Sequence, residues 1–372
     1  MHMERNISQF HLGDINSIPS KTWNHLKMNE ADLTIPSLNV AEKEQRPQSF
    51  KNHDYEIGPS ALPSEQKRKI ARIQTGSGEN LSCFIVKNDN AGCSIRIDGQ
   101  IKKPIEIAYE LNREYPTIID NTSVLIEKEA KATIVQTYRV KGEGDFFHAG
   151  STHVRVGPYA QFTLVQIQMT DSSTFDFQDT GFELEEGAQV SLIQVLLDSQ
   201  HTYAGAKALL QGEGSSFHLG CIYLGDGIRT IDTNYVVEHH GKKTTSNITA
   251  RGVLLDSASK MFRGTIDFKS GTKGSKGSEE EFALLFGPSV DNKSVPLILC
   301  GEEDVEGAHA VSSGRIDANA LLYLMSRGLD QKHSKKLLIK GQFFPVAKMI
   351  EDEVLRQEIL DTIERRLENH EY

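Results

Sequence analysis

The sequence lacks long hydrophobic runs and the short motifs that mark most nucleotide and zinc enzymes. Its longest apolar runs lie at 282–286, 295–300 and 320–325, far short of the roughly 18 residues that span a membrane. It has no G-x-x-x-x-G-K-[ST], H-E-x-x-H, C-x-x-C or dinucleotide-binding glycine motif. The glycines of 271–277 have the wrong spacing for a phosphate loop and predict a solvated turn. These absences disfavour a self-contained nucleotide hydrolase or a dedicated zinc site.

An excess of positive charge is also absent. The chain has 41 Lys and Arg against 51 Asp and Glu, which gives a formal net charge of -10. A nucleic-acid partner needs a basic face that neutralises phosphates, and docking on anionic lipid needs basic clusters. We therefore expect neither a nucleic-acid partner nor a membrane partner.

Cysteine is scarce: the 372 residues contain four, at 83, 93, 221 and 300. They are too few and too scattered for a disulfide framework. Residues 1–5 lead into polar sequence, so we expect no signal peptide here. We expect a reducing cytoplasmic location. Cys221 is predicted to lie in the core, and Cys83 and Cys93 flank a polar turn and receive no role.

A repeat with strand periodicity fills the middle of the chain. Similar segments begin at Ala130, Ala160 and Ala188, more weakly at Ser215, and most weakly at Lys242. The intervals are 27 to 30 residues, and apolar residues alternate within each copy. One such unit cannot bury its apolar face alone, whereas stacked units can. The pattern favours a parallel β-solenoid, and a β-sandwich is the competing architecture.

Three regions follow from the composition. Residues 1–80 contain frequent prolines and predict a loosely packed, partly helical region, with a short basic helix starting at Ser64. Residues 81–316 form the predicted solenoid. Residues 317–372 return to helical periodicity and predict a small subdomain that closes the open end of the solenoid.

The C-terminal subdomain has recognisable helix boundaries. Asp317 and Asp330 are predicted N-caps of two successive helices, and Gly328 is a predicted stop for the first of them. A third helix is expected from about residue 351. It carries one apolar stripe formed by Leu355, Ile359, Ile363 and Leu367.

Residues 250–344 carry a family likeness. The matching segments are 256–267 (DSASKMFRGTID), 284–287 (LLFG), 296–299 (PLIL), 304–317 (DVEGAHAVSSGRID) and 322–329 (LYLMSRGL). Together they resemble the core of the SufB/SufD family of iron–sulfur cluster assembly proteins. The likeness covers about a quarter of the chain, and the repeats at 120–250 agree with it in kind.

The resemblance implies a mainly β fold, a right-handed parallel β-helix with helical ends. It implies a non-catalytic scaffold that works with the ABC-type ATPase SufC, which would hydrolyse the nucleotide. In the family, SufC docks on the C-terminal helices, here represented by Leu322, Tyr323, Arg327 and Gly328. The resemblance also implies pairing with a SufB-like subunit or with a second copy of the chain.

The same likeness indicates which member of the family the chain resembles. SufB proteins carry a Cys and a Glu at positions that correspond here to Val290 and Ala310, and many carry an N-terminal Cys cluster that this chain lacks. SufD proteins often carry a Cys at the position of Gly307. The chain therefore looks SufD-like, or like a single-type SufBD protein that pairs with itself.

Two residues are candidate ligands for iron or an iron–sulfur cluster. The resemblance makes His309 the first candidate, because a His at that position is a proposed ligand at the subunit interface. Imidazole nitrogen binds iron well. Cys300 is the second candidate, although its apolar run favours a small buried hydrophobe. No resident cofactor is expected, only a transient cluster at a subunit interface.

Other polar clusters have simpler interpretations. The run 279–281 (EEE) predicts a solvated acidic turn. His239 and His240 are adjacent on a strand, so they point to opposite faces and should not share a metal. His148 and His153 lie in a glycine-rich region where they could meet a carboxylate.

Two alternative functions stay open. A β-helix enzyme acting on carbohydrate would need converging carboxylates, for which Asp171, Asp176, Asp179 and Asp198 are candidates on neighbouring coils. A purely structural SufD-like subunit would make no contact with metal.

Overall fold

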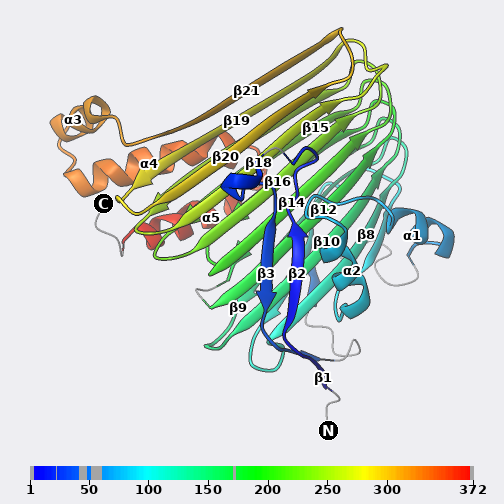
Figure 1. The fold of residues 1–372 in the computed structure, drawn as a ribbon, viewed down its shortest axis with the longest axis horizontal. Coiled ribbons are helices and arrows are strands. Elements are labelled where there is room, and N and C mark those ends of the chain that lie inside the picture. The colour runs from blue at the N-terminus through cyan, green and yellow to red at the C-terminus, as the bar shows by residue number, and fades with distance from the viewer. Residues whose placement is uncertain (1–3, 22, 42–47, 52–60, 171–172, 369–372) are drawn as a thin grey trace.

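The protein is a parallel β-solenoid with an N-terminal cap and a C-terminal helical tail (Figure 1). The computed structural model describes residues 4–21, 23–41, 48–51, 61–170 and 173–368. No helix within these ranges is long and apolar enough to cross a membrane.

The solenoid consists of two sheets whose strands alternate along the chain. The even sheet contains β6 (Ser94–Ile97), β8 (Thr117–Ile126), β10 (Phe146–Val156), β12 (Thr174–Leu184), β14 (His201–Leu210), β16 (Thr230–His239), β18 (Ser259–Phe268) and β20 (Asp291–Cys300). The odd sheet contains β5 (Gln48–Lys51), β7 (Ile105–Leu111), β9 (Lys131–Val140), β11 (Gln161–Met169), β13 (Gln189–Leu196), β15 (Ser216–Gly225), β17 (Thr245–Leu255), β19 (Ser275–Phe286) and β21 (Val305–Gly314). All neighbours pair in parallel except β5 with β7. Each strand pairs with the next but one, so the predicted solenoid is confirmed over the sandwich.

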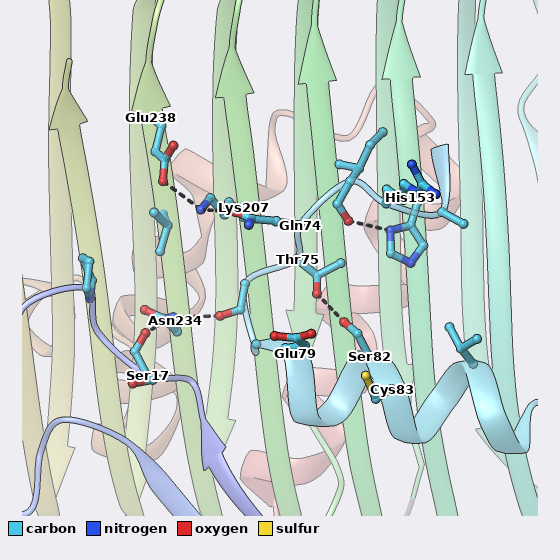
Figure 2. A pocket seen from close by; sticks show the side chains of 18 of the residues that line it. Ser17, Gln74, Thr75, Glu79, Ser82, Cys83, His153, Lys207, Asn234 and Glu238 are labelled. Atoms are coloured by element: carbon cyan, nitrogen blue, oxygen red, sulfur yellow. Dashed lines mark hydrogen bonds and ion pairs between the residues drawn. The ribbon is translucent and has the colours of Figure 1, made fainter. Parts of the chain in front are cut away.

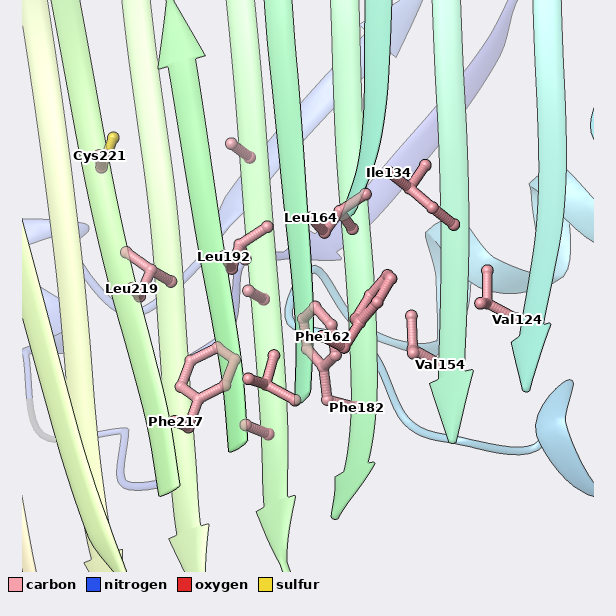
Figure 3. Packing of buried hydrophobic residues seen from close by; sticks show 14 of the residues in the cluster. Val124, Ile134, Val154, Phe162, Leu164, Phe182, Leu192, Phe217, Leu219 and Cys221 are labelled. Carbon is pink, nitrogen blue, oxygen red and sulfur yellow. The ribbon is translucent and has the colours of Figure 1, made fainter. Parts of the chain in front are cut away.

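Apolar ladders fill the space between the sheets. Ile134, Leu164, Leu192 and Leu219 are in register on four successive odd strands and are all fully buried (Figure 3). Each side chain of this size contributes about 1.5–3 kcal/mol when it is fully buried. Equivalent positions of the sequence repeat therefore lie in register on successive strands.

Each repeat begins after a residue in the left-handed backbone conformation. The six such residues at equivalent turns are Glu129, Tyr159, Gly187, Gly214, Lys243 and Gly274, with φ between 54° and 73°. The backbone N–H of each of these turn residues donates to a carbonyl of the next turn in the same stack. Thr245 pairs with Ser216, so the fifth repeat begins at Thr244. The predicted start at Lys242 is wrong by two residues because the preceding turn is longer.

The N-terminal cap covers the outer face of the even sheet. It comprises β1 (Glu4–Ile7), β2 (Phe10–Ile15), η1 (Asn24–Leu26), β3 (Ala31–Ile35), β4 (Leu38–Ala41), α1 (Ser64–Ile70) and α2 (Glu79–Asn88). The basic helix predicted from Ser64 is confirmed, whereas the antiparallel pairs β1–β4 and β2–β3 were not predicted. Arg263 of the sheet donates to Met28 O and pairs with Asp232, which fastens the cap to the solenoid.

The C-terminal tail consists of α3 (Ala318–Ser326), α4 (Gln331–Ala347) and α5 (Glu353–Glu368). The predicted caps are confirmed: the Asp317 carboxylate accepts from two backbone N–H groups of α3, and the Asp330 carboxylate accepts from His333 N. Helices α4 and α5 pack on the outer face of the odd sheet, where Phe343 and Ile363 are fully buried. The prediction that this tail closes the open end is therefore wrong. Its apolar stripe lies along the side of the solenoid.

Candidate functional site

The last rung of the solenoid is uncovered. Strands β20 and β21 are the terminal strands of their sheets, and the residues of β21 are mostly exposed along its whole length. Within the described ranges, no strand pairs with their outer edges. Unpaired backbone groups on a long edge strand are a template for pairing with another chain.

Two glutamates lie in the interior just beneath this rung. Glu279 and Glu281 are 2% and 1% exposed, and both point between the sheets because alternate residues of β19 face the interior. Only Glu280 faces outward, where it pairs with Arg251. The predicted solvated acidic turn is therefore wrong: the run belongs to a strand, and a strand buries every second residue.

Glu281 is fully satisfied by its neighbours. Its carboxylate accepts from Lys260 Nζ, from the Tyr223 hydroxyl at 2.7 Å and from the Ser294 hydroxyl at 2.6 Å. Burial lowers the pKa of Lys260, although Glu281 opposes this effect. Lys260 and Glu281 therefore form a buried ion pair in the interior of the solenoid.

Glu279 is not satisfied. Both carboxylate oxygens are buried without a hydrogen-bond partner among the described residues. Burial, and secondarily the charge of Glu281, raises the pKa of Glu279 to about 8. Glu279 is therefore mostly protonated and neutral at pH 7.

His309 lies directly above Glu279. The two are register partners on β21 and β19, so their side chains leave the same face of the odd sheet on rungs roughly 4.8 Å apart. His309 is exposed, and no hydrogen bond or ion pair joins its imidazole to the described residues. His309 and Glu279 are therefore neighbours on the last two rungs of the odd sheet.

Cys300 lies at the end of β20, in register with Phe268 rather than beside His309. It is exposed, so the prediction of a small buried hydrophobe is wrong, because within the described residues no further strand covers this end of β20. In contrast, Cys221 is fully buried as predicted, and burial raises its pKa to about 12.

No three His, Cys, Asp or Glu side chains within the described part of the chain are placed to hold a metal ion.

The other predicted polar residues have structural partners. His148 lies inside the solenoid between Asp120 and Asp176, at 2.8 and 2.6 Å. The nearby aspartates raise its pKa to about 9 against the opposing effect of burial. His153 bonds to Ile73 O on the outer face.

The pair His239 and His240 divides between two environments. His239 is buried and bonded to the Thr244 and Ser246 hydroxyls, and His240 bonds to Glu238 outside. The expectation that they point to opposite faces is confirmed.

The candidate aspartates of a carbohydrate enzyme do not converge. Asp176 faces the interior and His148, Asp179 accepts from Ser77 N of the cap at 2.7 Å, and Asp198 pairs with Arg366 of α5. Asp171 lies outside the described residues. The three aspartates that can be placed are engaged in three different environments.

Helix α3 presents an exposed apolar surface. None of its residues is buried, and the side chains of Leu322 and Tyr323 are 62% and 58% exposed. Arg327 lies over the Tyr323 ring at 5.2 Å, and Gly328 ends the helix with a φ of 98°. The four residues that the family likeness selected thus share one exposed element.

Sequence reasoning missed Glu279. The signal was present, because the residues Gly277, Glu279, Glu281 and Ala283 continue the alternation of the apolar run that follows. Three consecutive charges concealed it, since charge runs are usually solvated.

The fold and this site define a class: a β-solenoid with an open terminal rung and a helical tail attached to its side. Residues 109–342 match the family model described as SUF system FeS cluster assembly, SufBD core domain. The match covers more than half of the chain, and the protein belongs to this SufBD family.

Individual relatives are distant. The chain is 24% identical over 271 residues to the iron-sulfur cluster assembly protein SufD of Bacillus subtilis, covering 72% of this chain and 62% of that protein. It is 22% identical over 238 residues to SufD of Escherichia coli, covering 64% of this chain and 56% of that protein. A SufBD family protein of Mycobacterium leprae is 24% identical over 247 residues, which are 66% of this chain and 28% of the relative. The alignments therefore span less than two thirds of each of these relatives.

Proposed function

We propose that the protein is a non-catalytic scaffold subunit for iron–sulfur cluster assembly, working beside a SufC-like ABC ATPase. The observation that carries the proposal is the SufBD core match over 109–342. The open rung and the exposed α3 surface support it, because a scaffold needs surfaces for its partners.

The open rung is the surface for a second solenoid. Strands β20 and β21 each offer ten residues of edge backbone, enough to continue both sheets into another chain. The partner is a SufB-like subunit or a second copy of this chain.

His309, with Glu279 beneath it, would hold iron or a nascent cluster as cargo at this interface. The two residues supply one nitrogen and one carboxylate, so the partner must complete the ligand set. Cys300, at the other end of the rung, is a separate candidate thiol ligand. Iron would displace the proton that Glu279 holds at neutral pH, because a bound cation favours the charged carboxylate.

The exposed face of α3 is the surface for the ATPase. Leu322 and Tyr323 supply apolar area, while Arg327 and Gly328 fix the end of the helix. Large exposed apolar side chains that lie close together mark protein–protein interfaces.

Purification of the tagged chain with its SufC-type ATPase tests the docking. The double variant Leu322→Asp, Tyr323→Asp should lose the ATPase, because burying two new charges is unfavourable. The matched control is Val354→Asp on α5, an apolar residue that is 79% exposed, and it should retain the ATPase. Retention by the double variant, or no association in any form, would contradict the docking proposal.

The His309→Ala variant tests the role of the interface in handling iron. We expect cluster assembly to fall while the complex stays intact, and Glu279→Gln to give the same result. If His309→Ala changes neither iron binding nor assembly, the chain is the purely structural SufD-like subunit.

A further inference from the structure

A second concave site lies far along the chain from the open rung, between the cap and the even sheet. Helix α2 forms one side, the segment 71–78 forms another, and the outward faces of β10, β14 and β16 form the floor (Figure 2). The groove encloses about 740 Å³, which is within the range of sites for small organic ligands.

The walls of this groove are largely apolar. Ile73 and Val236 line it from the segment and the sheet, and Val86 lines it from α2. Val86 is 52% exposed, whereas its neighbour Ile85 is fully buried. Helix α2 therefore directs one face into the core and leaves an apolar residue of the other face in the groove.

The groove is held in a fixed shape. A Cβ on Gly76 would lie 2.1 Å from Ala206 N, so the segment lies directly against the sheet backbone. Asn234 Nδ2 donates to Gly76 O at 2.8 Å, and the hydroxyls of Thr75 and Ser82 bond at 2.9 Å (Figure 2). These contacts tie the segment to both the floor and α2, so the site exists before any ligand arrives.

Two cations in the groove lack partners. The side chains of Arg72 and Lys87 make no hydrogen bond or ion pair with the residues that the structure describes. The third cation, Lys207, is already bound to Gln74 and Glu238, each at 2.7 Å. The lining holds these three cations against two carboxylates, Glu79 and Glu238. This excess of positive charge, in a chain with a net charge of -10, favours an anionic ligand.

The floor also contains an unused acceptor. Asn234 is 1% exposed, and its Oδ1 has no partner among the described residues. Its Nδ2 donates to two carbonyls, of Gly76 and Ser17, which fixes the orientation of the amide. A buried acceptor without a partner lowers the stability of the protein, and a ligand donor that reaches it removes this cost.

We propose that this groove binds a small organic anion with an apolar body and a hydrogen-bond donor. Its anionic group lies at Arg72 and Lys87, its apolar body lies against Val86 and Val236, and its donor faces Asn234 Oδ1. This site does not depend on iron, on the open rung or on the ATPase. Its test is therefore independent of the proposed scaffold function.

The full chain contains its own reporter for this site. Cys83 lines the groove and is exposed, and Cys300 is exposed on the last rung. The probe is 8-anilinonaphthalene-1-sulfonate, an aromatic anion with an N–H donor. We expect it to slow the alkylation of Cys83 by iodoacetamide several-fold and saturably, with Cys300 unchanged, as read by peptide mass spectrometry. Binding of the probe to the exposed apolar side chains of α3 would not protect Cys83, because Cys83 reports only on the groove.

Variants assign the protection to the groove. The double variant Arg72→Glu, Lys87→Glu should abolish it, while Lys67→Glu, an exposed charge reversal on α1 outside the groove, should not. Glu79→Gln should strengthen it, because Glu79 lines the same groove and its carboxylate has no partner among the described residues. Val86→Trp fills the groove at an exposed position and should abolish protection without a change of charge. Unprotected Cys83 at saturating probe, or full protection in Val86→Trp, would overturn the proposal.

Discussion

His148 lies between two aspartates inside the solenoid, one from the preceding rung and one from the following rung. Both ring nitrogens are within hydrogen-bond distance of a carboxylate, and all three side chains are fully buried. Each aspartate keeps one oxygen without a partner among the described residues. The imidazolium therefore compensates two buried carboxylates that would otherwise face each other across one rung.

Replacing His148 should destabilise the fold strongly. His148→Phe leaves Asp120 and Asp176 buried without a cation, and removing one partner of a buried ionic group costs about 3–5 kcal/mol. Urea unfolding at pH 7 measures this loss. The control is His218→Phe at an exposed position, which should change stability by less than about 0.5 kcal/mol. A loss of unfolding free energy for His148→Phe no larger than that of the control would contradict the role of His148 as the cation between the two aspartates.

Asp179 should make stability depend on pH. Burial raises its pKa to about 7, above the value of an unfolded chain. Its contribution is therefore fully present below pH 4 and is lost as the pH rises through about 7. Asp179→Asn keeps an oxygen for Ser77 N and removes the titration. The variant should match the parent chain at pH 4 and exceed it at pH 8 by on the order of 2–4 kcal/mol. Equal pH profiles for the two proteins would contradict the shifted pKa.

At the scale of elements, a turn residue in the left-handed conformation precedes each repeated odd strand and reverses the chain into it. Gly214 has a φ of 70°, and a Cβ there would meet nothing within 4 Å. Any cost of Gly214→Ala is therefore backbone strain alone, about 1 kcal/mol. Gly99→Ala is the control, because Gly99 also has open space but no positive φ. Thermal unfolding should separate the two variants. If both have the same midpoint, the turn conformation is not a source of rung stability.

The predictable elements were those with a local signal. The repeat after Ala160 and Ala188 predicted the rungs, and Asp317 and Asp330 predicted helix starts, because side-chain oxygens cap the nearest backbone N–H groups. The antiparallel pairs of the cap carry no repeat and depend on contact with the distant even sheet, so they were missed. The attachment of the tail was also mispredicted, since an apolar stripe shows that a helix is covered but not by what.

The candidate site was predictable only in part. The family likeness selected His309, but its relation to Glu279 depends on the register between β19 and β21. That register is a long-range property, and three adjacent charges masked the interior direction of Glu279. Cys300 was assigned to the core on its apolar neighbours, although the terminal strand has no further rung to bury it.

At the scale of the whole molecule, two faces are covered and one end is open. The cap covers the even sheet and the tail covers the odd sheet, so the last rung and α3 remain as large uncovered surfaces within the described residues (Figure 1). The proposed scaffold uses one for a second solenoid and the other for an ATPase. The two surfaces lie on different elements, β20 and β21 on one side and α3 on the other.

The mass of the assembly purified through a tag on this chain, from its native host and by native mass spectrometry, tests the scaffold directly. We expect two solenoid subunits, either two copies of this chain or one copy with a SufB-like subunit, together with a SufC-type ATPase. A chain that is recovered alone, as a monomer without an ATPase, would contradict the proposed function.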